Sequence, residues 1–442
     1  NEVTAIDRMA KLTKEDIVAF ANKYLKEDNY AVIYKKQGKD PNEKKMTKPE
    51  ITPIITNRDV ASPFLVEVQE SAVKPIEPVF LDYQKDMSQL KAKSDIPVLY
   101  KQNVANDLFQ LIYVFDMGNN HDKALGTAFD YLEYLGTSDM TPEELKSEFY
   151  RLACTFYVSP GNERTYVVLS GLNENMPAAV QLFEKLLADA QVNKEAYTNM
   201  TSDILKARSD AKLNQGQNFS RLMSFAMYGP KSPATNLLTE AELTNMNPQE
   251  LVDRIHNQNS YKHRILYYGP SSSKDLLATI NQYHQVPAAL KDIPAGNEYA
   301  YLETPVTKVL VAPYDAKQIY MAQISNLDKK YDPAIEPIRA LYDEYFGGGM
   351  NSIVFQEMRE TRGLAYSAWA SIMPPSYLKY PYVLRTQIAT QNDKMIDAVT
   401  TFNDIINNMP ESEAAFKLAK DGLTNRLRTE RIIKGDIIWS YI

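Results

Sequence analysis

The residues with the clearest chemical potential lie between Gly347 and Tyr366. Three consecutive glycines, Gly347, Gly348 and Gly349, are more than a helix stop needs, and backbone without side chains lets another segment approach closely. Arg359 stands at the end of an expected short helix, and Tyr366 follows seven residues later at the start of an expected strand. A guanidinium and a phenol hydroxyl supply hydrogen-bond donors for peptide carbonyls or for a developing oxyanion.

The same stretch also has a structural explanation. A glycine stop, a short helix with Ile353, Val354 and Met358 facing inward, a glycine turn and a strand from Leu364 account for its local fold. This explanation does not require the second and third glycines, nor the arginine and tyrosine at their spacing. Both interpretations therefore stand side by side.

Other catalytic chemistries have little support in this sequence. Four histidines are present, His121, His256, His263 and His284, and none has the two-histidine helix spacing with a glutamate that binds zinc. His256 and His263 straddle an expected helix end and strand start, so we expect surface or capping roles. Cys154 lies in an apolar stretch without a histidine or positive cluster, which predicts a buried, unreactive thiol. No glycine-rich loop precedes Lys-Ser or Lys-Thr, so no phosphate-binding loop is expected.

Composition limits the class of protein. The chain has 442 residues, 44% hydrophobic and 24% charged, which is typical of a folded protein with about three domain-sized units. The net charge of −7 argues against nucleic acid as a partner. One cysteine excludes an internal disulfide and leaves the cellular compartment open. No apolar run reaches the roughly 18 residues that a membrane span requires, so no span is expected.

The first elements along the chain are a helix and a strand. Apolar residues recur at helical spacing over 10–24, with Thr13 and Asp16 in position to cap the helix. A β-rich run at 31–34 predicts the strand. Prolines are then scattered through a charged stretch, and we expect an interdomain linker over 39–95.

A complete unit follows the linker. Thr141 and Glu144 flank Pro142 as a strong helix start. The expected elements of this unit are strands at 108–115, 164–171 and 264–268 and helices at 125–135, from 142, from 177 and from 248.

The unit is repeated later in the chain. The helix 131–136 matches 342–347 at four of six positions, and 179–183 matches 398–402. We therefore predict an α+β protein with two copies of one unit of roughly 200 residues. The boundaries are 1–38 for the tail of a preceding domain, 39–95 for the linker, 96–290 for the first copy and 298–442 for the second, which ends before its closing helix and strand.

The run GGGMNSIVFQEMRETRGLAYS, the doubled unit and the proline-bearing linker resemble the insulinase/pitrilysin family of inverted-motif zinc metallopeptidases. The resemblance covers nearly the whole chain and is to the carboxyl-terminal half of a four-domain member. It implies two tandem homologous α/β sandwich domains with the mitochondrial-processing-peptidase-like metallohydrolase fold, the second incomplete at its C-terminus. In that family two halves close as a clamshell around a peptide. The first domain carries the zinc motif His-x-x-Glu-His on a helix, and the fourth supplies an arginine and a tyrosine that hold the substrate backbone over the zinc.

The resemblance assigns roles to individual residues. Arg359 and Tyr366 match the family's substrate-clamping pair, which implies contacts to substrate carbonyls and transition-state stabilisation. Gly347, Gly348 and Gly349 are expected to bind substrate beside them.

The zinc motif itself is missing from both copies. Its place in the first copy holds Asp130 and Tyr134 instead of the histidines, with Glu133 retained, and the second copy has Leu341 and Tyr345 there. Without zinc a lone glutamate does not lower the pKa of a water molecule. We therefore expect no cofactor in this chain, and zinc in the intact protein bound by the N-terminal half.

The expected function is that of the C-terminal half of a zinc-dependent metalloendopeptidase that degrades peptides in a closed chamber. This chain alone is expected to be inactive, and its partners are peptide substrates and the N-terminal catalytic half of the same protein. One alternative is a non-catalytic partner or scaffold paralogue of the family. Another is a free-standing peptide-binding module. A His-x-x-Glu-His motif upstream of Asn1 would distinguish the metalloendopeptidase half from the non-catalytic paralogue.

Overall fold

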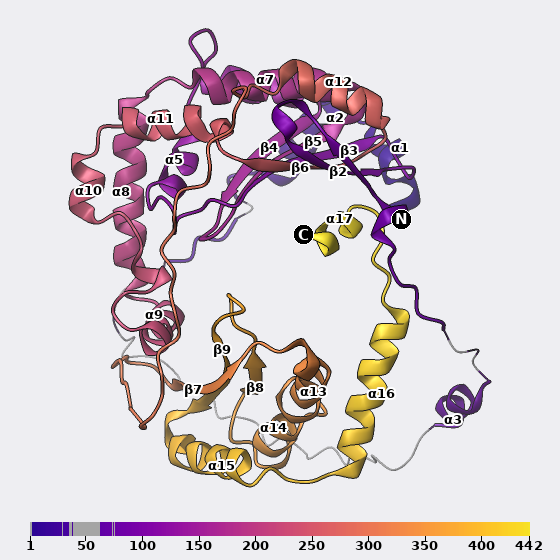
Figure 1. The fold of residues 1–442 in the computed structure, drawn as a ribbon, viewed down its shortest axis with the longest axis vertical. Coiled ribbons are helices and arrows are strands. Elements are labelled where there is room, and N and C mark those ends of the chain that lie inside the picture. The colour runs from indigo at the N-terminus through magenta and orange to yellow at the C-terminus, as the bar shows by residue number, and fades with distance from the viewer. Residues whose placement is uncertain (1, 29, 35–37, 39–61, 73, 75) are drawn as a thin grey trace. The chain divides into compact units, whose positions relative to one another are not determined.

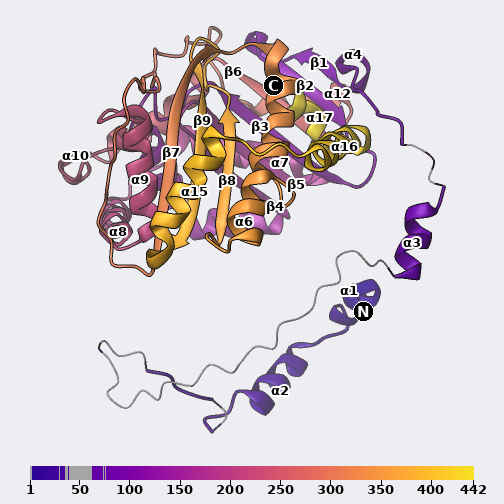
Figure 2. The same cartoon turned by 90° about the horizontal axis from the view of Figure 1, so that it is seen from below.

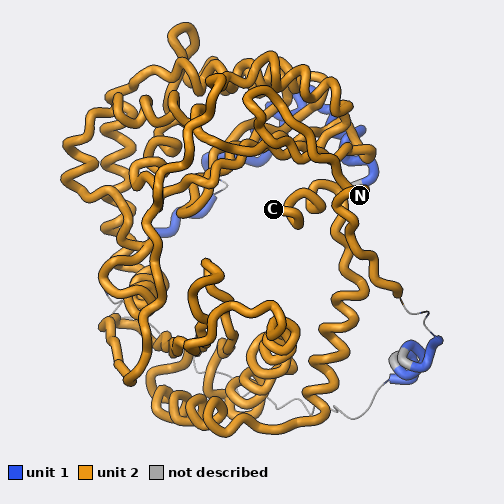
Figure 3. Tube along the Cα trace, viewed as in Figure 1, with its two compact units in different colours: residues 1–74 blue, residues 75–442 orange. Residues whose placement is uncertain are grey.

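The computed structural model describes residues 2–28, 30–34, 38, 62–72, 74 and 76–442. The chain divides into two compact units, residues 1–74 and residues 75–442 (Figure 3). No helix in these described ranges combines the length and the apolar character needed to cross a membrane.

The described part of the first unit contains the short α-helices α1 (Ala5–Met9), α2 (Lys14–Tyr24) and α3 (Pro63–Glu70). The predicted cap of α2 is confirmed: the Thr13 hydroxyl accepts from the Asp16 amide at 3.2 Å, and the Asp16 carboxylate accepts from the Thr13 amide at 2.9 Å. The apolar side chains of Ile17 and Phe20 on this helix are exposed.

The strand predicted at 31–34 does not form. Ile33 and Tyr34 are exposed, and a strand needs a neighbour to pair with, which the described part of this unit does not supply. Residues 39–61 of the predicted linker lie outside the described residues.

The second unit begins with a six-stranded sheet in the order β1-β2-β6-β3-β5-β4 (Figure 1). The β2–β6 pair is parallel, and the other neighbouring pairs are antiparallel. Its strands are β1 (Ser88–Lys91), β2 (Pro97–Gln102), β3 (Leu108–Phe115), β4 (Cys154–Pro160), β5 (Thr165–Leu172) and β6 (His263–Gly269).

The end of the predicted linker is part of this sheet, which corrects the expected boundary at residue 95. α4 (Tyr83–Asp86) and β1 lie within 39–95, and Leu90 of β1 pairs with Val98 of β2. The reason is hydrophobic burial: Met87 is buried and Leu90 packs against the main core, so this stretch is held on the sheet despite its charged neighbours.

β3 reads as a continuous apolar run because both of its faces are covered. Phe109, Leu111 and Phe115 belong to the main core, whereas Ile112 and Val114 face the other side of the sheet. There they meet the buried Ile437 and Ile438 of the C-terminal helix α17 (Asp436–Tyr441).

Helices cover the main-core face of the first sheet (Figure 1). The predicted capping box at the start of α6 is confirmed, with the Glu144 amide donating to the Thr141 hydroxyl at 3.2 Å and the Thr141 amide to Glu144 at 2.8 Å. The helices between β3 and the second sheet are α5 (Leu125–Leu132), α6 (Pro142–Arg151), α7 (Met176–Asp189), α8 (Lys194–Ala211), α9 (Gln215–Tyr228), α10 (Glu240–Asn245), α11 (Gln249–Asn257) and α12 (Ser273–Tyr283).

His263 is not the surface residue that the sequence suggested. It is buried at the start of β6, where its Nδ1 lies 2.7 Å from the Tyr261 carbonyl and its Nε2 lies 2.8 Å from His284 Nε2. His284 Nδ1 is in turn 2.6 Å from the buried Glu184 carboxylate. A carbonyl only accepts, so His263 carries its proton on Nδ1 and accepts from His284 at Nε2. His256, by contrast, is exposed as expected, and its Nε2 lies 3.1 Å from the Ala190 carbonyl.

A second sheet of three antiparallel strands follows in the order β7-β9-β8 (Figure 2). It repeats the order β3-β5-β4, with Ile388 of β9 paired to Met321 on one side and to Ala368 on the other. Phe346, Val354 and Phe402 are the centre of its core. Its elements are β7 (Gln318–Lys330), α13 (Glu336–Tyr342), α14 (Ile353–Phe355), β8 (Ser367–Met373), β9 (Pro381–Gln391), α15 (Met395–Asn407) and α16 (Glu413–Thr429).

Candidate functional site

The candidate site lies on the chain segment between α13 and β8. α13 ends in a π-helical turn, Asp343–Gly347, and α14 continues into a second one, Gln356–Thr361. π-Helical turns interrupt regular helices rarely, and often at functional sites. The inward positions of Ile353, Val354 and Met358 are confirmed by their burial.

Gly363 turns the chain back so that Tyr366 returns to Arg359. Its φ of +56° lies in the left-handed region that favours glycine, and its amide donates to the Arg359 carbonyl at 3.1 Å. The Tyr366 amide then donates to the Ala389 carbonyl of β9 at 3.0 Å. The turn at Gly363 is thus bonded to the end of the helix, and Tyr366 after it is bonded to the sheet.

The Arg359 guanidinium lies between two aromatic rings. Its Cζ is 5.4 Å from the centre of the Tyr366 ring and 5.0 Å from that of Phe355, and its Nε is 3.7 Å from a carboxylate oxygen of Glu360. Each cation–π contact contributes about 0.5–1 kcal/mol at an exposed position. These contacts orient the guanidinium before any ligand arrives.

Both side chains remain open to solvent. The Arg359 side chain is 43% exposed and Tyr366 is 73% exposed. Within the described ranges no hydrogen bond engages the Tyr366 hydroxyl. The structure therefore brings the two predicted residues together and leaves their donors accessible.

The three glycines differ in their surroundings. A Cβ added to Gly347 would lie 2.1 Å from the Ala370 carbonyl, so this buried glycine lets the helix end approach β8. The Gly348 amide donates to the Asp343 carbonyl at 2.7 Å. Gly349 has more room, with only a carboxylate oxygen at 3.7 Å. A Cβ added to Gly348 would lie 2.8 Å from the Asp343 carbonyl, so Gly347 and Gly348 both have a packing reason, although Gly348 is exposed and Gly349 half-buried.

Asp343 joins the first π-helical turn to β8 beneath the glycines. Its carboxylate accepts from the Ile372 amide at 2.8 Å, the Ser371 hydroxyl at 2.9 Å and Arg339 at 2.9 Å. Burial raises the pKa of Asp343, and the bonds from Ile372 and Ser371 oppose that shift. This carboxylate has a structural role, because its oxygens are already occupied.

The positions of the family's zinc motif do not fit a metal in either copy. Tyr345 donates its hydroxyl to the Pro410 carbonyl at 2.9 Å and accepts from the Ser412 amide at 3.1 Å, while Glu344 pairs with Arg426 at 3.2 Å. Glu133 of the first copy is exposed beyond the end of α5. Among the described residues no group of three or more His, Cys, Asp or Glu side chains could hold a metal ion.

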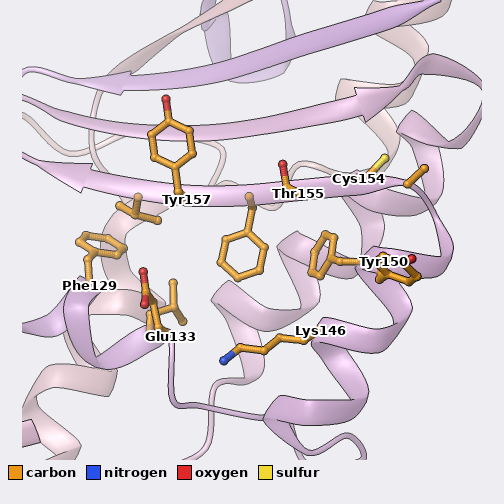
Figure 4. Close-up of a pocket in the computed structure, with 12 residues that line it drawn as sticks. Phe129, Glu133, Lys146, Tyr150, Cys154, Thr155 and Tyr157 are labelled. Carbon is orange, nitrogen blue, oxygen red and sulfur yellow. The ribbon is translucent and has the colours of Figure 1, made fainter. Parts of the chain in front are cut away.

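A cleft of about 640 Å³ on the first sheet was not anticipated from the sequence. It lies where α5 and α6 meet the edge strand β4 (Figure 4). Cys154 lies at this cleft and is buried, as predicted, and burial raises the pKa of its thiol. The only signal in the sequence was the alternation of side chains along β4, which does not show that a cleft adjoins the strand. The lining residues are Phe129, Leu132, Glu133, Lys146, Phe149, Tyr150, Ala153, Cys154, Thr155, Phe156, Tyr157 and Val158.

Known proteins share sequence and fold with this chain. Residues 265–423 match the family model described as the peptidase M16 inactive domain. An uncharacterized zinc protease of Rickettsia felis is 20% identical over 263 residues, which cover 56% of this chain and 60% of that protein.

Solved structures share the fold. The peptidase M16 inactive domain from Pseudomonas fluorescens superposes with a TM-score of 0.59 at 17% identity, covering 76% of this chain and 83% of that one. The periplasmic protease PqqL from Escherichia coli gives a TM-score of 0.64 at 15% identity, covering 96% of this chain and 44% of PqqL. A mutant of the ferredoxin protease FusC, solved in complex with Arabidopsis ferredoxin, superposes with a TM-score of 0.59 at 11% identity, covering 95% of this chain and 44% of FusC.

These matches confirm the predicted α+β fold and the resemblance to the insulinase-type, or M16, peptidases. The matched family model and the structure from Pseudomonas fluorescens are both described as the peptidase M16 inactive domain. It spans 60% of the length of the Rickettsia relative and less than half of PqqL and FusC.

Proposed function

We propose that this chain is the substrate-holding half of a zinc-dependent metalloendopeptidase. In this proposal Arg359 and Tyr366 hold a substrate carbonyl at a zinc centre that belongs to a separate N-terminal half of the same protein. The observation that carries the proposal is the exposed, pre-oriented arginine and tyrosine pair, with the guanidinium 5.4 Å from the phenol ring.

The chemistry follows from these two donors. A guanidinium and a phenol hydroxyl donate to the carbonyl oxygen of the scissile peptide and strengthen those bonds as negative charge develops on it. Donors that are fixed before the reaction lower its barrier more than donors that must reorganise. Gly348 and Gly349 would give the substrate backbone room beside them, and Gly347 would set the helix end against β8.

The domain organisation is part of the proposal. Residues 1–38 would be the tail of a preceding domain, and the exposed apolar side chains of α2 support a covering partner there. Residues 96–290 would be a structural domain without zinc, and 298–442 the substrate-clamping domain. The partners would be peptide substrates and the N-terminal half.

The test uses the full-length protein with Arg359→Lys and Tyr366→Phe. Removing one such donor from a transition state costs about 10²–10³-fold in turnover, so the kcat of Tyr366→Phe should fall by that order while zinc content is unchanged. The kcat of Arg359→Lys should fall as well, because an ammonium does not reproduce the fixed fork of donors on the guanidinium. Arg362→Lys is the matched control, because Arg362 is on the same segment, is exposed and, among the residues that the structure describes, forms an ion pair only with Glu357, at 3.4 Å. Its kinetics should equal those of the wild type.

Two results would remove the proposal. Wild-type kinetics in both Arg359→Lys and Tyr366→Phe would show that the pair does not contact the reacting carbonyl. Absence of both peptide hydrolysis and a His-x-x-Glu-His motif in the full-length protein would leave the scaffold paralogue as the function.

A further inference from the structure

The β4–β5 pairing determines which residues of β4 direct their backbone amides and carbonyls toward the free edge of the sheet. The Leu172 amide donates to the Ala153 carbonyl at 3.2 Å, and the Gly161 amide to the Arg164 carbonyl at 2.7 Å, at the two ends of the β4–β5 pair. In an antiparallel pair alternate residues point both backbone groups at the partner. The odd-numbered residues of β4 therefore face β5, and Phe156 and Val158 direct their amides and carbonyls outward.

This outward edge ends at a proline. Pro160 is the next residue whose backbone faces outward, and it has no amide hydrogen to donate. The unpaired stretch of the β4 edge is therefore short. In the described part of the chain no backbone hydrogen bond reaches Phe156 or Val158 from the side opposite β5. Unpaired strand edges of this kind accept another extended chain.

The cleft lies along the same edge. Phe156 and Val158 pack their side chains against the main core. The ring of Tyr157, which also lines the cleft and lies between them in sequence, is directed to the other side of β4 (Figure 4). The opposite wall carries Phe129 and Phe149, and a residue added opposite Phe156 would share its face. Bulky apolar side chains at alternate positions of an added strand would thus enter the cleft.

Two charges complete the lining. Lys146 of α6 extends into the space, and Glu133 lies across from it (Figure 4). The positive charge of Lys146 and the negative charge of Glu133 cancel, so the cleft favours a neutral peptide over an acidic ligand or a nucleic acid.

We propose that the free edge of β4 and its cleft bind an extended peptide with apolar residues at alternate positions, added antiparallel to the strand. This site is on the first sheet and is separate from the Arg359 and Tyr366 pair. Its occupancy does not require hydrolysis, so it stands independently of the proposed function.

The test is fluorescence anisotropy of the 442-residue chain with a labelled peptide, Thr-Ser-Leu-Thr-Phe-Ser-Thr. N-methylation of its Leu and Phe amides, which would pair with Val158 and Phe156, should weaken binding about tenfold, because two backbone hydrogen bonds are lost. N-methylation of the Thr between them, whose amide points away from β4, should leave affinity unchanged. Equal affinities for all three peptides would overturn the proposal.

Protein variants give the complementary test. Val158→Pro removes one outward amide and should weaken binding several-fold, whereas Ser159→Ala, whose amide faces β5, should not. If Val158→Pro does not fold, the peptide series decides alone. Arg362→Lys, on the segment between α14 and β8, should bind the peptide like the wild type, and loss of binding there would overturn the proposal. So would a dimer of the chain that Val158→Pro dissociates, because the occupant would then be a second copy.

Discussion

Acid should weaken the first sheet through His263. Burial, together with the neighbouring charge of His284, lowers the pKa of His263 from 6.5 to about 3. Protonation would also place an N–H on Nε2, where His263 now accepts from His284. The groups facing His263 are His284, Glu184 behind it and the Tyr113 ring, whose own pKa is raised by burial and by Glu184.

The size of the effect follows from proton linkage. Between pH 6.5 and about 3 the unfolded chain binds a proton at His263 that the folded chain does not, so stability falls as the pH is lowered. At pH 5 the loss is about 2 kcal/mol, from about 1.4 kcal/mol for each pH unit below 6.5. Below pH 3 the loss levels off at about 5 kcal/mol.

Hydrogen exchange measures this acid-induced loss of stability in the intact chain. Protection of amides in β6 and α12, corrected for intrinsic rates, should fall about 30-fold between pH 7.5 and 5. His263→Gln keeps an acceptor for His284 but does not titrate, so its protection should change far less. The same change in wild type and variant would refute the reasoning, because the acid sensitivity would then arise elsewhere.

Two further predictions concern the glycines and the cysteine. Gly347→Ala should destabilise the second sheet by about 1–3 kcal/mol, because its Cβ would lie 2.1 Å from the Ala370 carbonyl, whereas Gly349→Ala should be close to neutral in the same thermal melt. Equal melting temperatures for the two variants would contradict the packing described for Gly347. Cys154, buried and with a raised thiol pKa, should react with iodoacetamide about a hundredfold more slowly in the native chain than in urea. Rapid labelling of the native chain would show that the β4 cleft opens to the thiol.

The parts of the fold that sequence reasoning predicted depend on short-range signals. The caps at Thr13 and Thr141 involve residues three apart, so their pattern is complete within one helical turn. The proximity of Arg359 to Tyr366 was predictable for a similar reason, because Gly363 between them permits the reversal.

What the sequence did not show depends on distant residues. His263 is buried where it contacts His284, which in turn contacts Glu184, and these partners lie 21 and 79 residues away from it without any local signal of the contact. β1 lies in a charged stretch, and its place on the sheet depends on pairing with β2 and on the hydrophobic contacts of Leu90 and Met87. The β4 cleft needs two helices and an edge strand together, so alternation along one strand did not reveal it.

The central claim is that this chain holds the substrate backbone through Arg359 and Tyr366. The most direct measurement is a crystal structure of the full-length protein with a non-cleavable peptide at the zinc centre. We predict that the guanidinium and the phenol hydroxyl lie within about 2.7–3.2 Å of one substrate carbonyl oxygen. A peptide bound at the zinc centre with both side chains directed away from its backbone would contradict the account.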